Sequence, residues 1–304
     1  MKKGFGIKSC VAGLVLSLAL PLVSCTAPKE AEGQKATVTV SSHKMLEGKP
    51  TETAVYRYTT DKAGAKIVIV GGTHGDEVAG WSTALDLVKE IPDIAGVRGE
   101  ILLIPRVNIL ADNLQKRYAG EVNGVTYTDL NRAYPYPLGR ADTATDLNRA
   151  YPYPLGRADT ATAETIEIAD AVIEVIASFV GEVLEEKERN LCLVDLHESR
   201  SESGDGGRLG STLISVNDFF FMEDLMERYN TTYKGEGEKN FSHEEAVQDG
   251  SFSKYFSSLY PDSPVFTVET NRGRVNGVDT IPLSTRKRQQ RNVLNALFDL
   301  LWDR

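Results

Sequence analysis

The strongest structural signal in this sequence is an apolar run that stops at two glycines and passes into a helical pattern. Residues 65–70 read AKIVIV, which is typical of a strand buried on both faces of a sheet. Gly71 and Gly72 end the run, and residues 77–90 then carry apolar side chains at helical spacing. A buried strand that leads directly into a helix predicts a sheet covered by helices.

Strand and helix patterns alternate along the rest of the chain. Further strands are predicted at residues 100–104, 191–196, 212–216 and 264–268, and helices at residues 163–186 and in a last segment capped by Ser284. This alternation predicts the α/β class, with three α/β/α layers around a mixed, mostly parallel sheet. We expect residues 41–304 to form a single domain.

The first 25 residues form a separate segment. A basic head with three lysines precedes an apolar run at residues 11–23, which is too short for a bilayer span of ~20 residues. The run ends in the letters LVSC, and Cys25 resembles the lipobox cysteine of bacterial lipoproteins. We therefore predict a lipoprotein signal peptide at residues 1–25, lipidation at Cys25, and a polar tether at residues 26–40.

The charge balance limits the partners of the chain. Its formal net charge is −9 at pH 7, and the basic head lies in the segment that a lipoprotein loses, so the remaining chain is more acidic still. An acidic surface argues against nucleic acid as a partner. We predict an exported protein that touches the bacterial membrane only through its lipid anchor. Because Thr26 rather than aspartate follows Cys25, we expect the periplasmic side of the outer membrane.

A 17-residue unit occurs twice in tandem. Residues 129–145 read DLNRAYPYPLGRADTAT, and residues 146–162 repeat those letters without change. Two copies do not make a solenoid, which requires at least three stacked repeats. The unit is rich in proline, glycine and aspartate, so we expect it to lie in a loop that tolerates insertion.

Two histidines stand beside acidic residues at the ends of predicted strands. His74 and Glu77 follow the first strand across a tight turn, where both side chains can face one ion. His197 comes at the end of the strand 191–196, and Asp195 lies on the same face of that strand as outer support. Carboxyl ends of parallel strands meet at one edge of a sheet. Two imidazoles and a carboxylate are the ligands of many catalytic zinc sites, which leave a position for water.

Four motifs occur in the order found in a known enzyme family. The letters GGTHGDE, DLNR, VDLHES and FTVET resemble the zinc carboxypeptidase superfamily, and most closely its succinylglutamate desuccinylase/aspartoacylase branch, across residues 66–272. The resemblance implies a zinc-carboxypeptidase-like fold with one zinc ion held by His74, Glu77 and His197. It also implies that Glu269, in the motif FTVET, is the general base.

The family also uses an Asn-Arg pair to grip the substrate carboxylate, and the duplication offers two such pairs. Asn131 with Arg132 and Asn148 with Arg149 are chemically identical, and only one pair can enter the pocket. We favour the first pair and leave the second open.

An upstream arginine of the family polarises the scissile carbonyl. Arg117 is the better match for this role, and Arg106 is the alternative. Two guanidinium groups, one on a carboxylate and one on a carbonyl, point to a substrate with a free carboxylate near the cleaved bond.

These features together predict a zinc-dependent hydrolase that cleaves an amide bond near a free carboxylate, as a carboxypeptidase or peptide amidase. Zinc-bound water would attack, with Glu269 as general base. The substrate would be a small peptide or an acyl amino acid with a free carboxylate.

Two alternatives stay open: a deacylase of N-acyl amino acids, and a catalytically silent lipoprotein that binds a ligand. The aspartoacylase branch usually continues with a β-domain after the catalytic glutamate, whereas residues 270–304 are mostly one predicted helix. This departure favours an open cleft and peptide substrates, including those of the cell wall.

Overall fold

The computed structural model describes residues 36–137, 155–181, 190–199, 210–216, 219–246 and 248–302. These residues belong to one compact unit, Lys35–Arg304. The predicted signal peptide, Cys25 and most of the predicted tether lie outside the described residues, as do Asn148 and Arg149. In the described part of the chain, no helix combines the length and apolar character that a membrane crossing requires.

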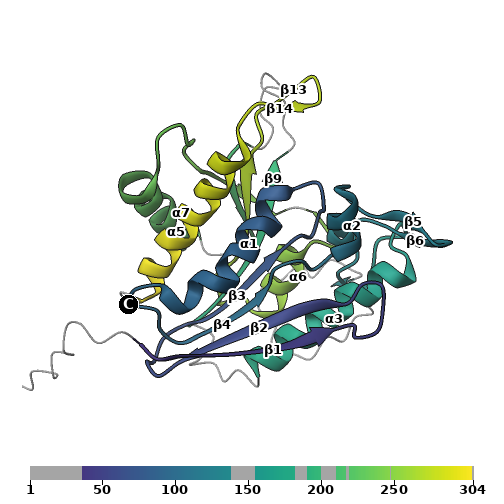
Figure 1. The fold of residues 1–304 in the computed structure, drawn as a ribbon, viewed down its shortest axis with the longest axis horizontal. Helices are drawn as coiled ribbons and strands as arrows, with labels where there is room; N and C mark the ends of the chain where they lie inside the picture. The colour runs from purple at the N-terminus through teal and green to yellow at the C-terminus, as the bar shows by residue number, and fades with distance from the viewer. Residues whose placement is uncertain are drawn as a thin grey trace, which may run out of the picture. The chain divides into compact units, whose positions relative to one another are not determined.

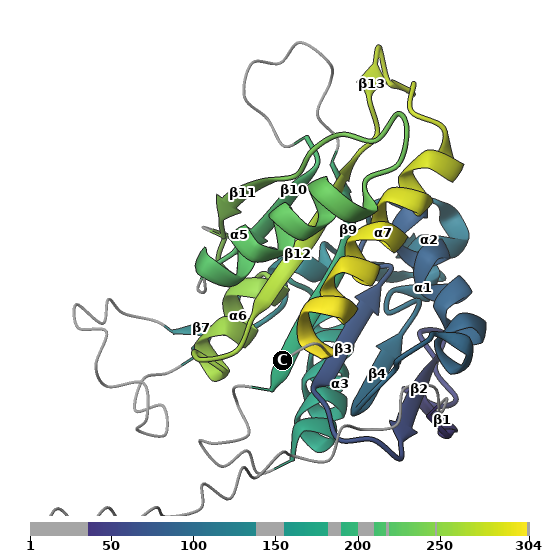
Figure 2. The ribbon, with the colours of Figure 1, turned by 90° about the vertical axis from the view of Figure 1, so that its left-hand side faces the viewer.

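An eight-stranded sheet forms the centre of this unit, with the strand order β1-β2-β4-β3-β9-β12-β10-β11 (Figures 1 and 2). The strands are β1 (Val38–Met45), β2 (Thr53–Thr60), β3 (Lys66–Gly71), β4 (Glu100–Ile104), β9 (Leu191–Ser199), β10 (Thr212–Ser215), β11 (Ser242–Glu245) and β12 (Val265–Asn271). The four central strands β4, β3, β9 and β12 are parallel. β2 pairs antiparallel with both β1 and β4, and β10 pairs antiparallel with β12.

Helices cover both faces of the sheet (Figures 1 and 2). One face carries α1 (Val78–Glu90), α5 (Phe219–Arg228) and α7 (Leu283–Trp302), and the other carries α3 (Ala163–Val180) and α6 (Phe252–Leu259). Successive side chains of β3 point to opposite faces of the sheet and so contribute to two hydrophobic cores. Ile67 and Ile69 face the first set of helices, and Val68 and Val70 face the second. The predicted three-layer α/β/α class with a mixed, mostly parallel sheet is therefore confirmed.

Shorter elements lie at the ends of the sheet. They are α2 (Ile109–Leu114), β5 (Gly120–Val122), β6 (Val125–Tyr127), β7 (Tyr136–Pro137), β8 (Leu155–Gly156), β13 (Arg274–Val275), β14 (Val278–Asp279), the short helical turns Ile91–Asp93 and Leu130–Arg132, and the π-helical turn Tyr229–Tyr233. Each of the three strand pairs β5–β6, β7–β8 and β13–β14 is antiparallel.

Two predicted helix ends require correction. The last helix begins at Leu283, so Ser284 lies inside it and does not cap it; the carbonyl of Pro282 accepts the first helical bonds, from Thr285 and Arg286. The helix predicted at 163–186 ends at Val180, and the residue after it, Gly181, has a φ of 73°. Residues 182–189 lie outside the described residues.

Candidate metal centre and pocket

The turn after β3 holds His74 and Glu77 because of its glycines. Gly72 has a φ of +80°, a conformation that side chains disfavour. Gly75 touches α2 so closely that a Cβ atom there would lie 2.0 Å from the backbone of Ala111. The turn is therefore pressed against α2, which fixes the direction of the two side chains that follow from it.

Strand register brings the distant residues to the same edge. In the parallel ladder, Gly71 pairs with Leu196 of β9, and the next residue of β9, His197, pairs with Glu269 of β12. The carboxyl ends of β3, β9 and β12 thus align.

His74, Glu77 and His197 form a group that can hold a metal ion. All three are buried, and one ligand atom of each lies within 4.8 Å of the others. His74 Nδ1 lies 2.7 Å from Glu77 Oε1, and His197 Nδ1 lies 2.8 Å from Glu77 Oε2. Both imidazoles therefore point the same ring nitrogen toward one carboxylate, as ligands of a common ion would.

The outer nitrogen of each imidazole meets a second carboxylate. His197 Nε2 lies 2.7 Å from Asp195, which also accepts a hydrogen bond from Thr73 at 3.0 Å. His74 Nε2 lies 2.9 Å from Asp129. Such partners fix the tautomer and the ring plane of a metal-binding histidine. Asp195 has the supporting position expected from the sequence, whereas the role of Asp129 was missed, although it begins the DLNR motif.

Charge in the cluster favours a cation. Burial lowers the pKa of His74 and of His197, but the neighbouring carboxylates raise the pKa of each further, so the net shift is upward. Burial raises the pKa of Glu77, but the two histidines lower it well below its usual range. Without a metal, the raised pKa values favour protons on the two imidazoles, whose positive charge offsets the negative charge of the buried carboxylates. A divalent cation can replace those protons, since metal binding and proton release are coupled.

Asp129→Asn tests the outer support of His74. The amide keeps the size of the side chain but loses its charge, so we expect metal affinity to fall about 10- to 100-fold. Competition with a chromophoric chelator measures this affinity. Asp146 is the same residue of the second repeat copy, and Asp146→Asn is the matched control, expected to leave the affinity unchanged. A loss of affinity in Asp146→Asn alone would assign the role to the second copy.

Glu269 faces the same pocket from β12. Burial, followed by the negative charge of Glu77, raises the pKa of Glu269 to about 7. Its Oε2 atom is buried and has no hydrogen-bond partner among the residues that the structure describes. A carboxylate in this state is suited to accept a proton from a reactant.

Arg117 is also directed into the pocket. Its Nε donates to Asp129 at 3.0 Å, and its Nη1 lies 3.3 Å from Glu77. The side chain is thus held at two points while one guanidinium edge contacts the cluster. The role assigned to it from the sequence is compatible with this position.

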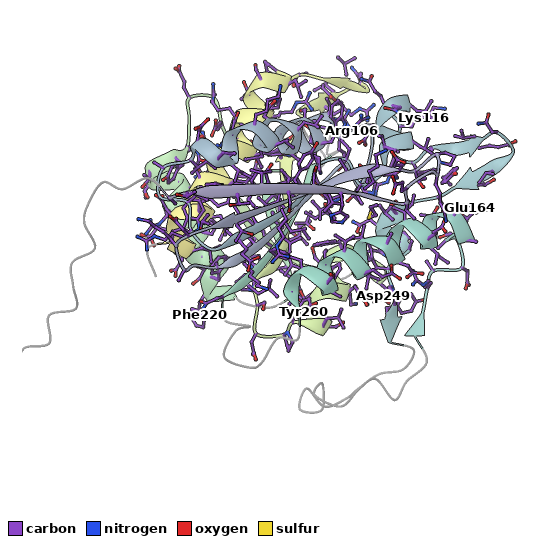
Figure 3. The ribbon with its side chains drawn as sticks, turned by 60° about the horizontal axis from the view of Figure 1, so that its bottom comes forward. Arg106, Lys116, Glu164, Phe220, Asp249 and Tyr260 are labelled. Atoms are coloured by element: carbon purple, nitrogen blue, oxygen red, sulfur yellow. The ribbon has the colours of Figure 1, made fainter. Side chains whose placement is uncertain are left out.

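Arg106 is engaged elsewhere. Its Nε lies 3.2 Å from Asp112, its Nη2 donates to Asn113 at 2.7 Å, and its guanidinium carbon lies 5.4 Å from the centroid of the Trp81 ring. Figure 3 labels the side chain of Arg106. It is not among the residues that line the pocket. The structure therefore brings Arg117, and not Arg106, to the candidate site.

Asp112, beside Arg106, makes stability depend on pH. Burial raises its pKa to about 7, and Arg106 only partly opposes this. In the unfolded chain the Asp112 carboxyl ionises near pH 4, so its contribution to stability should fall as the pH rises from about 4 to 7, on the order of 4 kcal/mol in total. Asp112→Asn should reduce this slope by the contribution of Asp112 and stabilise the protein above pH 7. Urea unfolding at pH 5 and 8 measures both, and an unchanged slope would contradict the assignment.

One pocket of about 430 Å³ joins these groups. Its lining comprises His74, Glu77, Arg117, Asn131, Arg132, Glu198, Ser199, Ile214, Glu244, Glu245, Ala246, Gln248, Ser251, Ser253, Thr267 and Glu269. Asn131 and Arg132 of the first repeat copy are part of this lining. The amide oxygen of Asn131 accepts a hydrogen bond from the backbone of Phe252 at 2.9 Å, which leaves its NH₂ group directed elsewhere.

Helix α7 supports β9 from behind the pocket. Gln290 donates to the carbonyl of His197 at 2.8 Å, and Arg286 pairs with the buried carboxylate of Glu198. Neither contact is visible in the sequence pattern, because both join residues more than 80 positions apart.

The chain matches a known family model over part of its length and resembles several solved structures in fold. The model of the succinylglutamate desuccinylase/aspartoacylase catalytic domain matches residues 63–143. An aspartoacylase family protein from Mesorhizobium loti is 19% identical, with 87% of this chain and 71% of that chain covered and a TM-score of 0.51. Succinylglutamate desuccinylase from Vibrio cholerae is 18% identical over 88% and 67% of the chains, with a TM-score of 0.53. Carboxypeptidase A from Helicoverpa armigera is 12% identical over 86% and 67%, with a TM-score of 0.56. No curated protein matches the sequence.

The chain therefore has a carboxypeptidase-like fold, a partial match to the catalytic-domain model over residues 63–143, and a potential metal site at His74, Glu77 and His197. The resemblance to the zinc carboxypeptidase superfamily, and to its succinylglutamate desuccinylase/aspartoacylase branch, is confirmed.

Proposed function

We propose that this protein is a zinc-dependent hydrolase that cleaves an amide bond beside a free carboxylate, as a carboxypeptidase or peptide amidase. The observation that carries the proposal is that His74, Glu77, Arg117 and Glu269 line one pocket. His197 joins the group through Glu77, whose Oε2 lies 2.8 Å from His197 Nδ1. These groups supply a metal site, a base and a cation within reach of one bound molecule.

The metal ligands, Glu269 and Arg117 would each have a separate role in the reaction. Zinc, held by His74, Glu77 and His197, would lower the pKa of a bound water toward ~7. Glu269 would take a proton at its free Oε2 and return it to the leaving nitrogen. Arg117 would place its guanidinium edge against the oxygen of the scissile carbonyl, where negative charge develops. His74, Glu77 and His197 are buried, which strengthens electrostatic interactions at the metal site.

The Asn131-Arg132 pair would select substrates with a terminal carboxylate. A guanidinium fork matches a carboxylate in bidentate fashion, and an amide NH₂ adds a further donor. Loss of the carboxylate from a substrate should therefore weaken binding strongly.

Glu244 and Glu245 bear on the choice between a peptide and an acyl amino acid. Both side chains are exposed at the edge strand β11, and both line the pocket. Acyl derivatives of aspartate or glutamate carry two carboxylates, and the second would meet this acidic wall. The wall therefore favours a peptide over a dianionic acyl amino acid. The match to the desuccinylase/aspartoacylase model keeps the deacylase as the second candidate.

A substrate panel with a zinc assay tests the proposal. The panel contains peptides, cell-wall peptides and acyl amino acids, each with a free or an amidated carboxyl group. We expect one zinc per chain and hydrolysis only of free acids. One bound zinc with no turnover across the panel would favour the third alternative, a silent ligand-binding protein.

The acidic wall makes a separate prediction about side-chain preference. Peptides that end in lysine should be hydrolysed about tenfold more efficiently than those that end in glutamate, because exposed charge pairs contribute up to ~1 kcal/mol each. The double variant Glu244→Gln/Glu245→Gln should abolish this ratio, measured as kcat/KM. An unchanged ratio would mean that Glu244 and Glu245 do not determine this side-chain preference.

Export and the lipid anchor at Cys25 remain part of this proposal, and they would bring the pocket to peptides outside the inner membrane. Metabolic labelling with an alkyne fatty acid should mark the protein, and Cys25→Ser should abolish the label.

A further inference from the structure

The described residues contain one complete repeat unit assembled from both copies. Asp129 to Pro137 are the first nine residues of the first copy, and Leu155 to Thr162 are the last eight of the second. Together they spell the 17-residue unit once. The chain between them, residues 138–154, is also 17 residues long, the length of one unit.

The head of this composite unit is anchored in the candidate site. Asp129 contacts His74 and Arg117, and Asn131 accepts from the backbone of Phe252. The backbone of Tyr134 donates to the carbonyl of Gly250 at 3.2 Å. The head therefore has fixed partners on the turn after β3 and around the start of α6.

The tail of the composite unit is anchored to α3 and reaches back to the head. Arg157 pairs with Asp170 of α3 and donates to the carbonyl of Ala133, the residue after Arg132. Its own carbonyl accepts a hydrogen bond from Tyr136 at 3.3 Å. The guanidinium of Arg157 in the second copy thus links the backbone of Ala133, directly after the first copy's Asn-Arg pair, to helix α3.

We infer that the pocket is completed by this composite unit, in which Arg157 of the second copy is a positioning residue for Asn131 and Arg132 of the first. The inference deepens the proposed function, since it rests on that pair as the binder of the substrate carboxylate. Arg157 does not line the pocket and acts through the backbone of Ala133.

Chain connectivity explains why the head and the tail come from different copies. The head follows β6 directly, and the backbone of Thr128 donates to Thr165 of α3 at 2.8 Å. The tail precedes α3 directly, and the backbone of Thr162 donates to Thr128 at 3.2 Å. These two hydrogen bonds hold the start of the head and the end of the tail beside each other at α3. Extra length is therefore accommodated between the halves, where loop closure adds little cost.

The junction between the halves is compatible with a chain that has one copy. Tyr136 pairs with Gly156, and Pro137 pairs with Leu155. If Pro137 were joined to Leu155, these four residues would form the sequence Tyr-Pro-Leu-Gly, with proline second and glycine fourth, as type I turns favour. Removal of residues 129–145, 138–154 or 146–162 leaves the same sequence. Deletion therefore cannot distinguish the copies, whereas point substitutions can.

Five arginine variants of the full chain test the inference, because each copy supplies the control for the other. Arg157→Ala should raise KM for a free-acid substrate about tenfold with little change in kcat, since a charge-assisted hydrogen bond is lost behind the pair. Arg157→Lys should recover part of this loss. Arg140→Ala, the same change in the first copy, should be silent. Arg132→Ala should raise KM more than Arg157→Ala, and Arg149→Ala should be silent.

Two readouts do not require catalysis. Hydrogen exchange of peptides that cover residues 129–137 should increase in Arg157→Ala and stay unchanged in Arg140→Ala. The single-copy chain should keep the wild-type zinc content and exchange pattern. If no substrate is hydrolysed but these results hold, the proposed function fails and the composite unit stands.

Other results would overturn the composite unit. Equal effects of Arg157→Ala and Arg140→Ala, or an effect of Arg140→Ala alone, would contradict it. So would a single-copy chain that fails to bind zinc.

Discussion

Glu269→Gln is expected to lower kcat for amide hydrolysis by about 10²- to 10⁴-fold, the usual contribution of a general base. The amide has the same shape as the carboxylate but cannot take a proton. Glu269 lies beside His197 in the strand register and is not one of the three predicted metal ligands, so zinc content should stay the same. Steady-state kinetics and metal analysis on the same sample measure both quantities.

Glu227→Gln is the control for Glu269→Gln, because Glu227 lies on α5, outside the pocket lining. It should have wild-type kinetics. If Glu269→Gln kept zinc and near wild-type kcat, another group would have to serve as the base, and the mechanism proposed for this pocket would be wrong. A loss of zinc in Glu269→Gln would instead indicate that Glu269 supports the metal.

The central sheet could be predicted because its strands are buried. β3 and β9 carry continuous apolar runs, and both were located to within a few residues. The strand β1 was not predicted, because most of its side chains are exposed and its sequence lacks an apolar run. β2 pairs with β4 and was missed as well, because its sequence TAVYRYTT has neither a continuous apolar run nor a strict alternation of apolar and polar residues.

The candidate metal ligands could be predicted because strand ends fix them locally. His74, Glu77 and His197 each stand at the carboxyl end of a recognisable strand. Asp129 could not be assigned in the same way, because its contact with His74 depends on how a loop 55 residues away returns to the sheet. Burial would raise the pKa of Asp129, but His74 and Arg117 lower it well below its usual range, so it stays ionised.

The sequence could not decide which repeat copy contributes the Asn-Arg pair, for a different reason. Asn131 and Asn148 have identical neighbours on both sides, so no local property separates them. The distinguishing property is global: β6 lies just before the first copy and α3 just after the second. Only the three-dimensional arrangement shows that the first copy's Asp129 contacts His74 and that the second copy's Arg157 pairs with Asp170 of α3.

His197→Ala is expected to abolish both metal binding and hydrolysis. Loss of a direct ligand should reduce zinc affinity by more than ~100-fold, the upper effect of losing an outer partner. Without the metal, water keeps a pKa near ~15.7, so turnover should fall by at least ~10⁴-fold. Isothermal titration with zinc and the substrate assay measure the two losses.

The same variant should also be less stable than metal-free wild type. In wild type without metal, His197 separates the buried carboxylates of Glu77 and Asp195 and contacts both. Its removal leaves two buried negative charges without their shared partner, which costs about 3–5 kcal/mol. Chemical unfolding of both proteins in the presence of chelator measures the difference.

The control for His197→Ala is His243→Ala, because His243 lies on the edge strand β11 and bonds to Ser215 at 2.8 Å, away from the cluster. It should bind zinc and hydrolyse substrate like wild type. If His197→Ala retained stoichiometric zinc and activity, the ion would have other ligands. The two imidazoles, only 4.8 Å apart between ring centroids, would then need a different explanation.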